Sequence, residues 1–150
     1  MDVIRFSDEK EKKYALASLI FAEKLGLIDD SSLDSVYERC KKENEARQKK
    51  TENGEIVYGP LSFKPQEYLD YELTRFKLDF AGEVDKVKKV YDYPEIRKKD
   101  MKAYYKQNKD LFTRYCNERF FFFEVKSVIY KKIREEEYEN EINGILCQLD

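Results

Sequence analysis

Apolar residues recur at helical spacing along most of the chain, and Gly and Pro fall between these periodic stretches. The clearest stripe follows Pro65, a residue type that is common at the first position of a helix. Its members are Leu69, Leu73, Phe76 and Phe80. An earlier stretch, YALASLIFAEKLG, has the same period and ends at Gly26. The pattern predicts a mainly α protein.

Further start and stop signals divide the chain into about five helices. Ser7 and Asp8 precede the first helix, and the SSLD motif at residues 31–34 opens a second. The polar run KKENEARQKKTENGE continues the second helix as a solvated arm or frays into a loop, and the arm is favoured. The third helix, which begins at Pro65, is expected to continue past Gly82 to about Tyr91. Pro94 is expected to open the fourth, and residues 130–149 form the last.

The aromatic stretch NERFFFFEVKSVIY, residues 117–130, interrupts this helical pattern. Aromatic and β-branched residues without Gly or Pro favour an extended conformation over a helix. A strand here would pair with GEIVYG, residues 54–59, or with the same strand of a second molecule. We therefore expect a helical domain with at most one short strand or a small two-stranded sheet, and at least two of Phe120, Phe121, Phe122 and Phe123 in the core.

The length of 150 residues fits one domain with its own hydrophobic core. We predict a single helical domain over residues 1–150. A subdivision into a helical body, residues 1–93, and a second part, residues 94–150, is the alternative. The second part would hold the linker helix, the Phe-rich strand and the C-terminal helix.

Charge and hydropathy narrow the range of partners. The 29 Lys and Arg nearly balance the 31 Asp and Glu, so the net charge of −2 provides no overall field for nucleic acid or an anionic membrane. No apolar run approaches the roughly 20 residues that span a bilayer, and the first residues lack the apolar core of a signal peptide. We expect neither nucleic-acid binding nor membrane insertion.

The residue types needed for common catalytic and metal sites are scarce. The chain has no His, and its three Cys form no C-x-x-C motif, which excludes Ser-His and Cys-His nucleophiles and the usual zinc sites. Carboxylate pairs such as Glu135 with Glu139, or Asp29 with Asp30, are typical of solvated helix faces in so charged a chain. We therefore predict a protein that is not an enzyme, with no catalytic, cofactor-binding or metal-binding residues and no cofactor.

One segment resembles a known family. The stretch YPEIRKKDMKAYYKQNKDLF, followed by RYCNERFFFFEV, resembles the junction in parvulin-type chaperone foldases of the SurA and PrsA kind, where a linker helix leads into the first isomerase strand. The matching positions are Pro94, Tyr104, Tyr105, Asn108 and Phe112, and the long early helices extend the resemblance over Tyr14–Val125. The family's isomerase strand carries a His, where this chain has Phe122 and Phe123, and too few residues follow for a complete isomerase domain. The resemblance implies a helical polypeptide-binding module without isomerase activity, located outside the cytoplasm if an export signal was removed.

These observations leave two functions open. The first is a non-catalytic, chaperone-like module that binds unfolded or extended polypeptide through an apolar aromatic surface. The second is a structural or regulatory all-α homodimer, whose apolar surface is covered by its own second copy. The residues expected to form the surface are Phe76, Phe80, Tyr104, Tyr105, Phe120, Phe121, Phe122 and Phe123.

Overall fold

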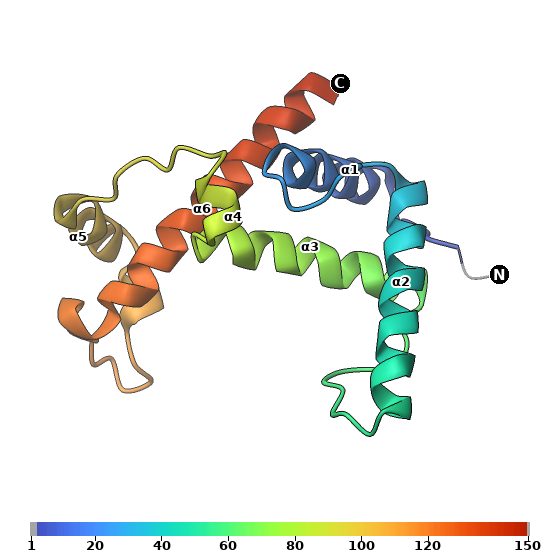
Figure 1. Ribbon diagram of the computed structural model, residues 1–150. Coiled ribbons are helices and arrows are strands. Elements are labelled where there is room, and N and C mark those ends of the chain that lie inside the picture. The colour runs from blue at the N-terminus through green and yellow to red at the C-terminus, as the bar shows by residue number, and fades with distance from the viewer. Residues whose placement is uncertain (1–2, 150) are drawn as a thin grey trace.

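The computed structural model describes residues 3–149, and its helices confirm the mainly α fold (Figure 1). Within this range there is no strand, and the only β-type pairing is an isolated bridge between Thr113 and Arg119. None of the described helices is both long enough and apolar enough to cross a membrane. The elements are α1 (Glu9–Lys24), α2 (Leu33–Glu52), α3 (Pro65–Ala81), α4 (Asp85–Lys88), α5 (Lys98–Gln107), the 3-10 turn η1 (Lys109–Phe112) and α6 (Phe122–Leu149).

Most helix starts follow the signals in the sequence. The Asp8 side chain accepts a hydrogen bond from the Glu11 N–H at 2.8 Å and caps α1. Ser32 caps α2, which continues as a polar helical arm to Glu52, as predicted. Pro65 is the first residue of α3, where its missing N–H leaves no helical hydrogen bond unmade.

Two expected boundaries before the phenylalanine run were wrong. Helix α3 does not continue to Tyr91 but ends at Ala81, because Gly82 caps it and Glu83 adopts a left-handed conformation with φ of 50°. The short α4 follows this turn. Helix α5 begins at Lys98 rather than at Pro94, because the Asp100 side chain accepts a hydrogen bond from the Arg97 N–H at 2.9 Å and so sets the helix start there.

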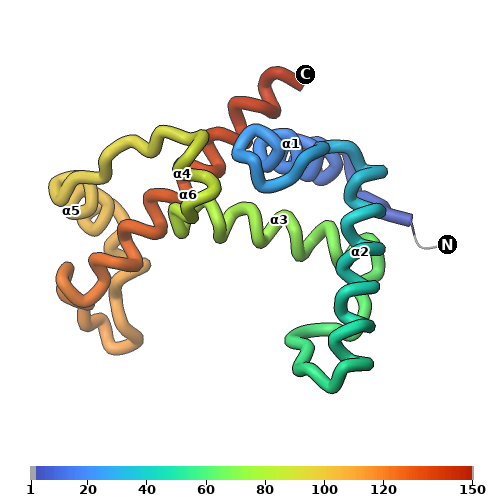
Figure 2. The backbone as a smooth tube through the Cα atoms, viewed as in Figure 1, coloured from blue at the N-terminus to red at the C-terminus, as the bar shows by residue number. Residues whose placement is uncertain are grey.

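The helices form an arch (Figure 1). Helix α3 joins two legs: α2 packs on one end of α3, and α6 packs on the other end and on α1. We call α2 and the loop that follows it, residues 33–64, the α2 leg. We call α5, η1, the next loop and the first part of α6, residues 95–132, the α6 leg. Figure 2 shows α6 running from the foot of its leg up past α3 to α1.

The main core lies where α1, α3 and the second half of α6 meet, and we call this part the body. Phe80 is fully buried at its centre, with its ring 5.7 Å from that of Phe21 and 5.5 Å from that of Tyr138. The rings of Tyr91 and Tyr93, from the segment after α4, lie 4.9 and 5.0 Å from Phe80. Aromatic residues from four segments therefore form one ring cluster.

A second, smaller core holds the α6 leg together. Its buried members are Met101, Phe112, Val125 and Ile129. Between the two cores, Arg134 of α6 is buried, and its guanidinium donates to Glu137 at 2.7 Å and lies 4.6 Å from the centre of the Tyr93 ring. Glu83, in the turn after α3, lies 3.7 Å from the same guanidinium. This buried ion pair links the middle of α6 to the end of α3 and fixes where the leg leaves the body.

Candidate interaction surface

The phenylalanine run begins α6, so the predicted strand was wrong. The Phe121 N–H donates to the Glu124 carboxylate at 2.8 Å, and the Glu124 N–H donates to the Phe121 carbonyl at 2.9 Å. This reciprocal bonding closes the first helical turn. Phe122, Val125 and Ile129 then face the leg core at helical spacing, and this burial outweighs the strand propensity of four phenylalanines. The expected pairing with residues 54–59 is not formed.

The run divides its side chains between two environments. Phe120 and Phe122 are half-buried and pack against the leg core. Phe121 and Phe123 are 65% and 76% exposed, and their rings stack face to face at 5.6 Å. The two stacked rings form an apolar projection at the start of the helix. Exposed aromatic surface of this kind is typical of binding sites.

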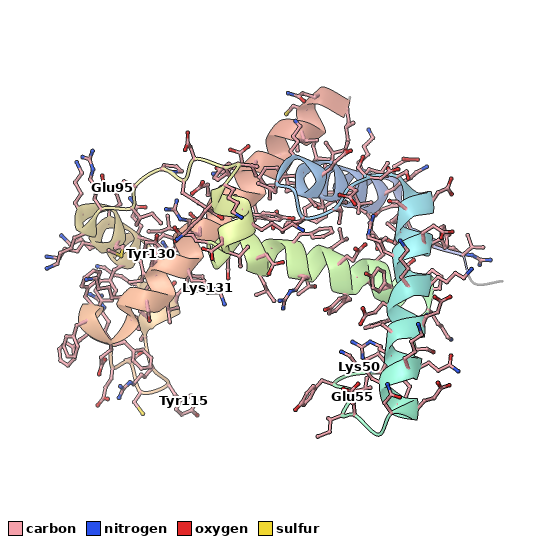
Figure 3. The ribbon with its side chains drawn as sticks, viewed as in Figure 1. Lys50, Glu55, Glu95, Tyr115, Tyr130 and Lys131 are labelled. Atoms are coloured by element: carbon pink, nitrogen blue, oxygen red, sulfur yellow. The ribbon has the colours of Figure 1, made fainter. Side chains whose placement is uncertain are left out.

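A recess of about 560 Å³ lies beside this projection, between α5 and α6. Met101 of α5 and Ile96, just before it, form one wall. The other wall is a single face of α6, since Phe123, Lys126, Ser127 and Tyr130 follow one another at spacings of three, one and three residues. Figure 3 places Tyr130 on the side of α6 that faces α5. The Tyr130 hydroxyl donates to Glu83, which ties the upper end of the recess to the joint with the body.

The structure brings together six of the eight predicted surface residues. Tyr104 and Tyr105 of α5 are half-buried beside the phenylalanine run, and the Tyr105 hydroxyl donates to the Phe120 carbonyl. Burial, followed by the nearby Glu136 carboxylate, raises the pKa of Tyr104. The other two residues, Phe76 and Phe80, are 4% and 0% exposed in the body, so they cannot contact a partner.

The apolar surface extends to parts of the molecule that the sequence did not indicate. Tyr115 is exposed at the foot of the α6 leg, where Figure 3 shows it, and Leu111 is exposed in η1. The foot of the α2 leg, marked in Figure 3 by Lys50 and Glu55, has its own exposed apolar side chains. These are Ile56, Tyr58 and Leu61.

The α2 foot is a well-supported loop. The Arg47 guanidinium donates to the Tyr58 carbonyl at 2.6 Å and to the Pro60 carbonyl at 2.8 Å. Gly59, between them, has φ of 86°, a conformation that a side chain would disfavour. Asn44 accepts a hydrogen bond from the Phe63 N–H at 2.6 Å and donates to its carbonyl at 2.9 Å. The exposed apolar residues of the α2 foot are therefore presented by a fixed backbone.

The acidic side chains of α6 are engaged in structural contacts. Glu139 accepts hydrogen bonds from the Tyr14 hydroxyl and from Lys77, both at 2.9 Å. Burial, and then the bond to Glu139, raises the pKa of Tyr14 to about 12. Glu135 pairs with Lys132 at 3.9 Å. Among the described residues, no group of three or more His, Cys, Asp or Glu is placed to hold a metal ion.

Comparison with known proteins identifies a fold but no family. No protein-family model matches the sequence, and neither does any curated protein. Two solved structures match, the native and selenomethionine forms of the GH136 lacto-N-biosidase from Eubacterium ramulus. Each has a TM-score of 0.74, 24% identity and coverage of 91% of this chain. The chain spans 28% of the length of that protein.

The expected relation to parvulin-type chaperone foldases is wrong. The matching structures are of a glycoside hydrolase, and no family model or curated protein supports a chaperone. The stretch taken as an isomerase strand is the start of α6. The matched positions were aromatic and polar residues at helical spacing after a Pro, a pattern that helical proteins of many kinds share. What the likeness establishes is that the helical fold of this chain also occurs within a lacto-N-biosidase chain.

Proposed function

We propose that this chain is a non-catalytic docking module that binds the catalytic domain of a glycoside hydrolase, carried on the same chain or on another. The observation behind this proposal is the exposed aromatic surface of the α6 leg, where Phe121 and Phe123 project beside an apolar recess. A contiguous aromatic surface next to a recess is typical of protein interfaces, because aromatic anchors bury large areas with few rotatable bonds.

The arch supports a folded domain as the partner rather than a short peptide. Both feet carry exposed apolar side chains, and they lie at the same open side of the arch (Figure 1). A short peptide covers one groove, whereas a folded domain contacts separate surface patches at once. The likeness to a lacto-N-biosidase supports the class of partner, because 28% of that chain corresponds to this fold and the rest lies outside it.

The side chains also support assigning the chemistry to the partner. Most glycoside hydrolases use two carboxyl groups on either side of the bond that is cleaved, one of them free to transfer a proton. Here Glu139 is held by Lys77 and Tyr14, and Glu137 is held by Arg134. These two glutamates of α6 are therefore committed to structural contacts, which supports a docking role for this helix.

Photo-crosslinking in the cells that produce the protein tests this proposal. The variant Phe123→p-benzoylphenylalanine places a photoreactive ring at the edge of the recess, and Lys10→p-benzoylphenylalanine, on the exposed face of α1, is the matched control. We expect the first variant to crosslink to a glycoside hydrolase domain, identified by mass spectrometry, and the control to give no such adduct. The same adducts from both positions, or adducts at position 123 without a glycoside hydrolase, would contradict the proposal.

A further inference from the structure

The near-neutral total charge conceals a strong division between the α6 leg and the rest of the chain. The leg, residues 95–132, contains eleven Lys and Arg and five Asp and Glu, a net charge of +6. The remaining residues contain 18 Lys and Arg and 26 Asp and Glu, a net charge of −8. A local field of this size attracts acidic groups even when the whole molecule is slightly acidic.

The positive charge is available at the recess. Three of the leg's five carboxylates are engaged locally, since Glu95 pairs with Arg97, Asp100 accepts the Arg97 N–H, and Glu124 pairs with Arg114. No carboxylate lines the recess, but Lys126 lies in its wall. No described carboxylate lies within ion-pair distance of this lysine or of three other exposed lysines of the leg. These are Lys98, Lys99 and Lys131.

We infer that the recess between α5 and α6 binds an acidic segment of the partner, anchored by a large aliphatic or aromatic side chain. This inference rests on the proposed docking function and specifies the chemistry of the partner. Ile96, Met101, Phe123 and Tyr130 provide apolar walls for the anchor, and the recess volume of about 560 Å³ lies in the range of ligand-binding pockets. Lys126, in the wall of the recess, then pairs with an Asp or Glu beside the anchor, and the net positive charge of the leg steers its approach.

Two other occupants fit the surface less well. An anionic lipid surface would also attract basic and aromatic residues, but it does not require a walled recess of side-chain size beside them. A symmetric dimer through the α6 legs would bring two surfaces of charge +6 together, which like-charge repulsion opposes. A head-to-tail contact between copies would build rings or open filaments rather than a closed dimer.

Fluorescence anisotropy with short labelled peptides tests the inference. The main probe has Asp and Glu on both sides of a Phe-Leu anchor. One matched peptide replaces the acids by Asn and Gln, and another replaces the anchor by Gly-Gly. We expect the acidic anchored peptide to bind about tenfold more tightly than either matched peptide, as several exposed ion pairs together would give. Added salt should reduce the preference for the acidic peptide over its Asn and Gln counterpart, because salt screens the ion pairs.

Variants of the recess localise the binding. Lys126→Glu should reduce the preference for acid by about threefold or more, and Phe123→Ser should reduce the preference for the anchor by a similar factor, because each removes one of several contributing groups. Lys10→Glu on α1 makes the same charge change away from the leg and should leave both preferences intact. Because Phe123 and Lys126 are exposed, circular dichroism should show that all three variants keep the wild-type fold.

Other outcomes overturn the inference. These are equal binding of the three peptides, binding that the recess variants do not change, tighter binding to phosphatidylserine vesicles than to the peptide, or self-association that needs Phe123. Equal peptide binding together with a position-123 crosslink to a glycoside hydrolase would reject the acidic segment and keep the docking function. Acid-selective peptide binding without that crosslink would reject the glycoside hydrolase as the partner.

Discussion

The body and the α6 leg use aromatic residues in opposite ways. The main core contains eighteen buried described residues, most of them in the body, where the ring of Phe80 is enclosed by those of Phe21, Tyr91, Tyr93 and Tyr138. In the leg, only four of the described residues form the buried core, while Phe121 and Phe123 stack in solvent. The aromatic cluster of the body is therefore buried, whereas part of the aromatic surface of the leg is exposed to solvent.

Polar groups are paired with one another in the body and are less completely paired in the leg. In the body, Tyr14, Lys77 and Glu139 satisfy one another, and Arg134 is enclosed by carboxylates and rings at the joint. In the leg, Lys126 faces the recess without a carboxylate beside it. Internal pairing of charges contributes to a fixed structure, whereas unpaired charge around an apolar recess suits recognition of another molecule. The comparison predicts that stability lies mainly in the body, and it supports the proposal that binding takes place in the leg.

The largest expected effect comes from opening the ring cluster of the body. Phe80→Ala should lower the free energy of unfolding by about 3 to 5 kcal/mol, because it removes a fully buried ring and leaves a cavity among four others. Chemical denaturation measures the change. The control Phe121→Ala, at a side chain that is 65% exposed, should shift the free energy by no more than about 0.5 kcal/mol. Similar losses from both would show that the body is not the main source of stability.

A smaller effect separates the two halves of the phenylalanine run. Phe120→Ser with Phe122→Ser should destabilise the protein by about 2 to 3 kcal/mol, because both half-buried rings pack on the leg core. Hydrogen exchange should show the loss first in α5 and the start of α6. Phe121→Ser with Phe123→Ser should leave the midpoint of unfolding nearly unchanged. Equal destabilisation by the two pairs would mean that the whole run is core, and its link to binding would be withdrawn.

Much of the helical fold could be predicted because its signals are local. Pro65 opens α3, and Asp8 lies at the cap of α1. The predicted strand for the phenylalanine run was wrong, because the spacing of its apolar residues outweighs their strand propensity. The positions of Phe122, Val125, Ile129 and Ile133 already show the helical period that places them against the leg core.

The candidate surface could be predicted only in part. The exposed rings of Phe121 and Phe123 belong to a run that composition singles out. Phe76 and Phe80 carry the same residue type, and only the packing of α1, α3 and α6 reveals that they are covered. The basic leg was missed because a net charge of −2 averages over the whole chain, although counting over residues 95–132 reveals it. The joint at Arg134 depends on Glu83 and Tyr93, contacts over more than 40 residues that no local pattern predicts.

The smallest expected effect tests the internal pairing of the body through its dependence on pH. The pKa of Tyr14 in the folded protein is about 12, above its ordinary value of 10, because burial and the nearby Glu139 carboxylate disfavour the tyrosinate. The neutral hydroxyl therefore stabilises the fold fully below pH 10, and this contribution is lost as the pH rises from 10 to about 12. Tyr14→Phe should make the fall in unfolding free energy across this range shallower, as measured by chemical denaturation at successive pH values. Tyr115→Phe, the same change at a fully exposed ring of the leg, should leave the slope as it is in the wild type. If Tyr14→Phe also left the slope unchanged, the bond between Tyr14 and Glu139 would not contribute to the stability of the body, and the contrast with the leg would rest on apolar burial alone.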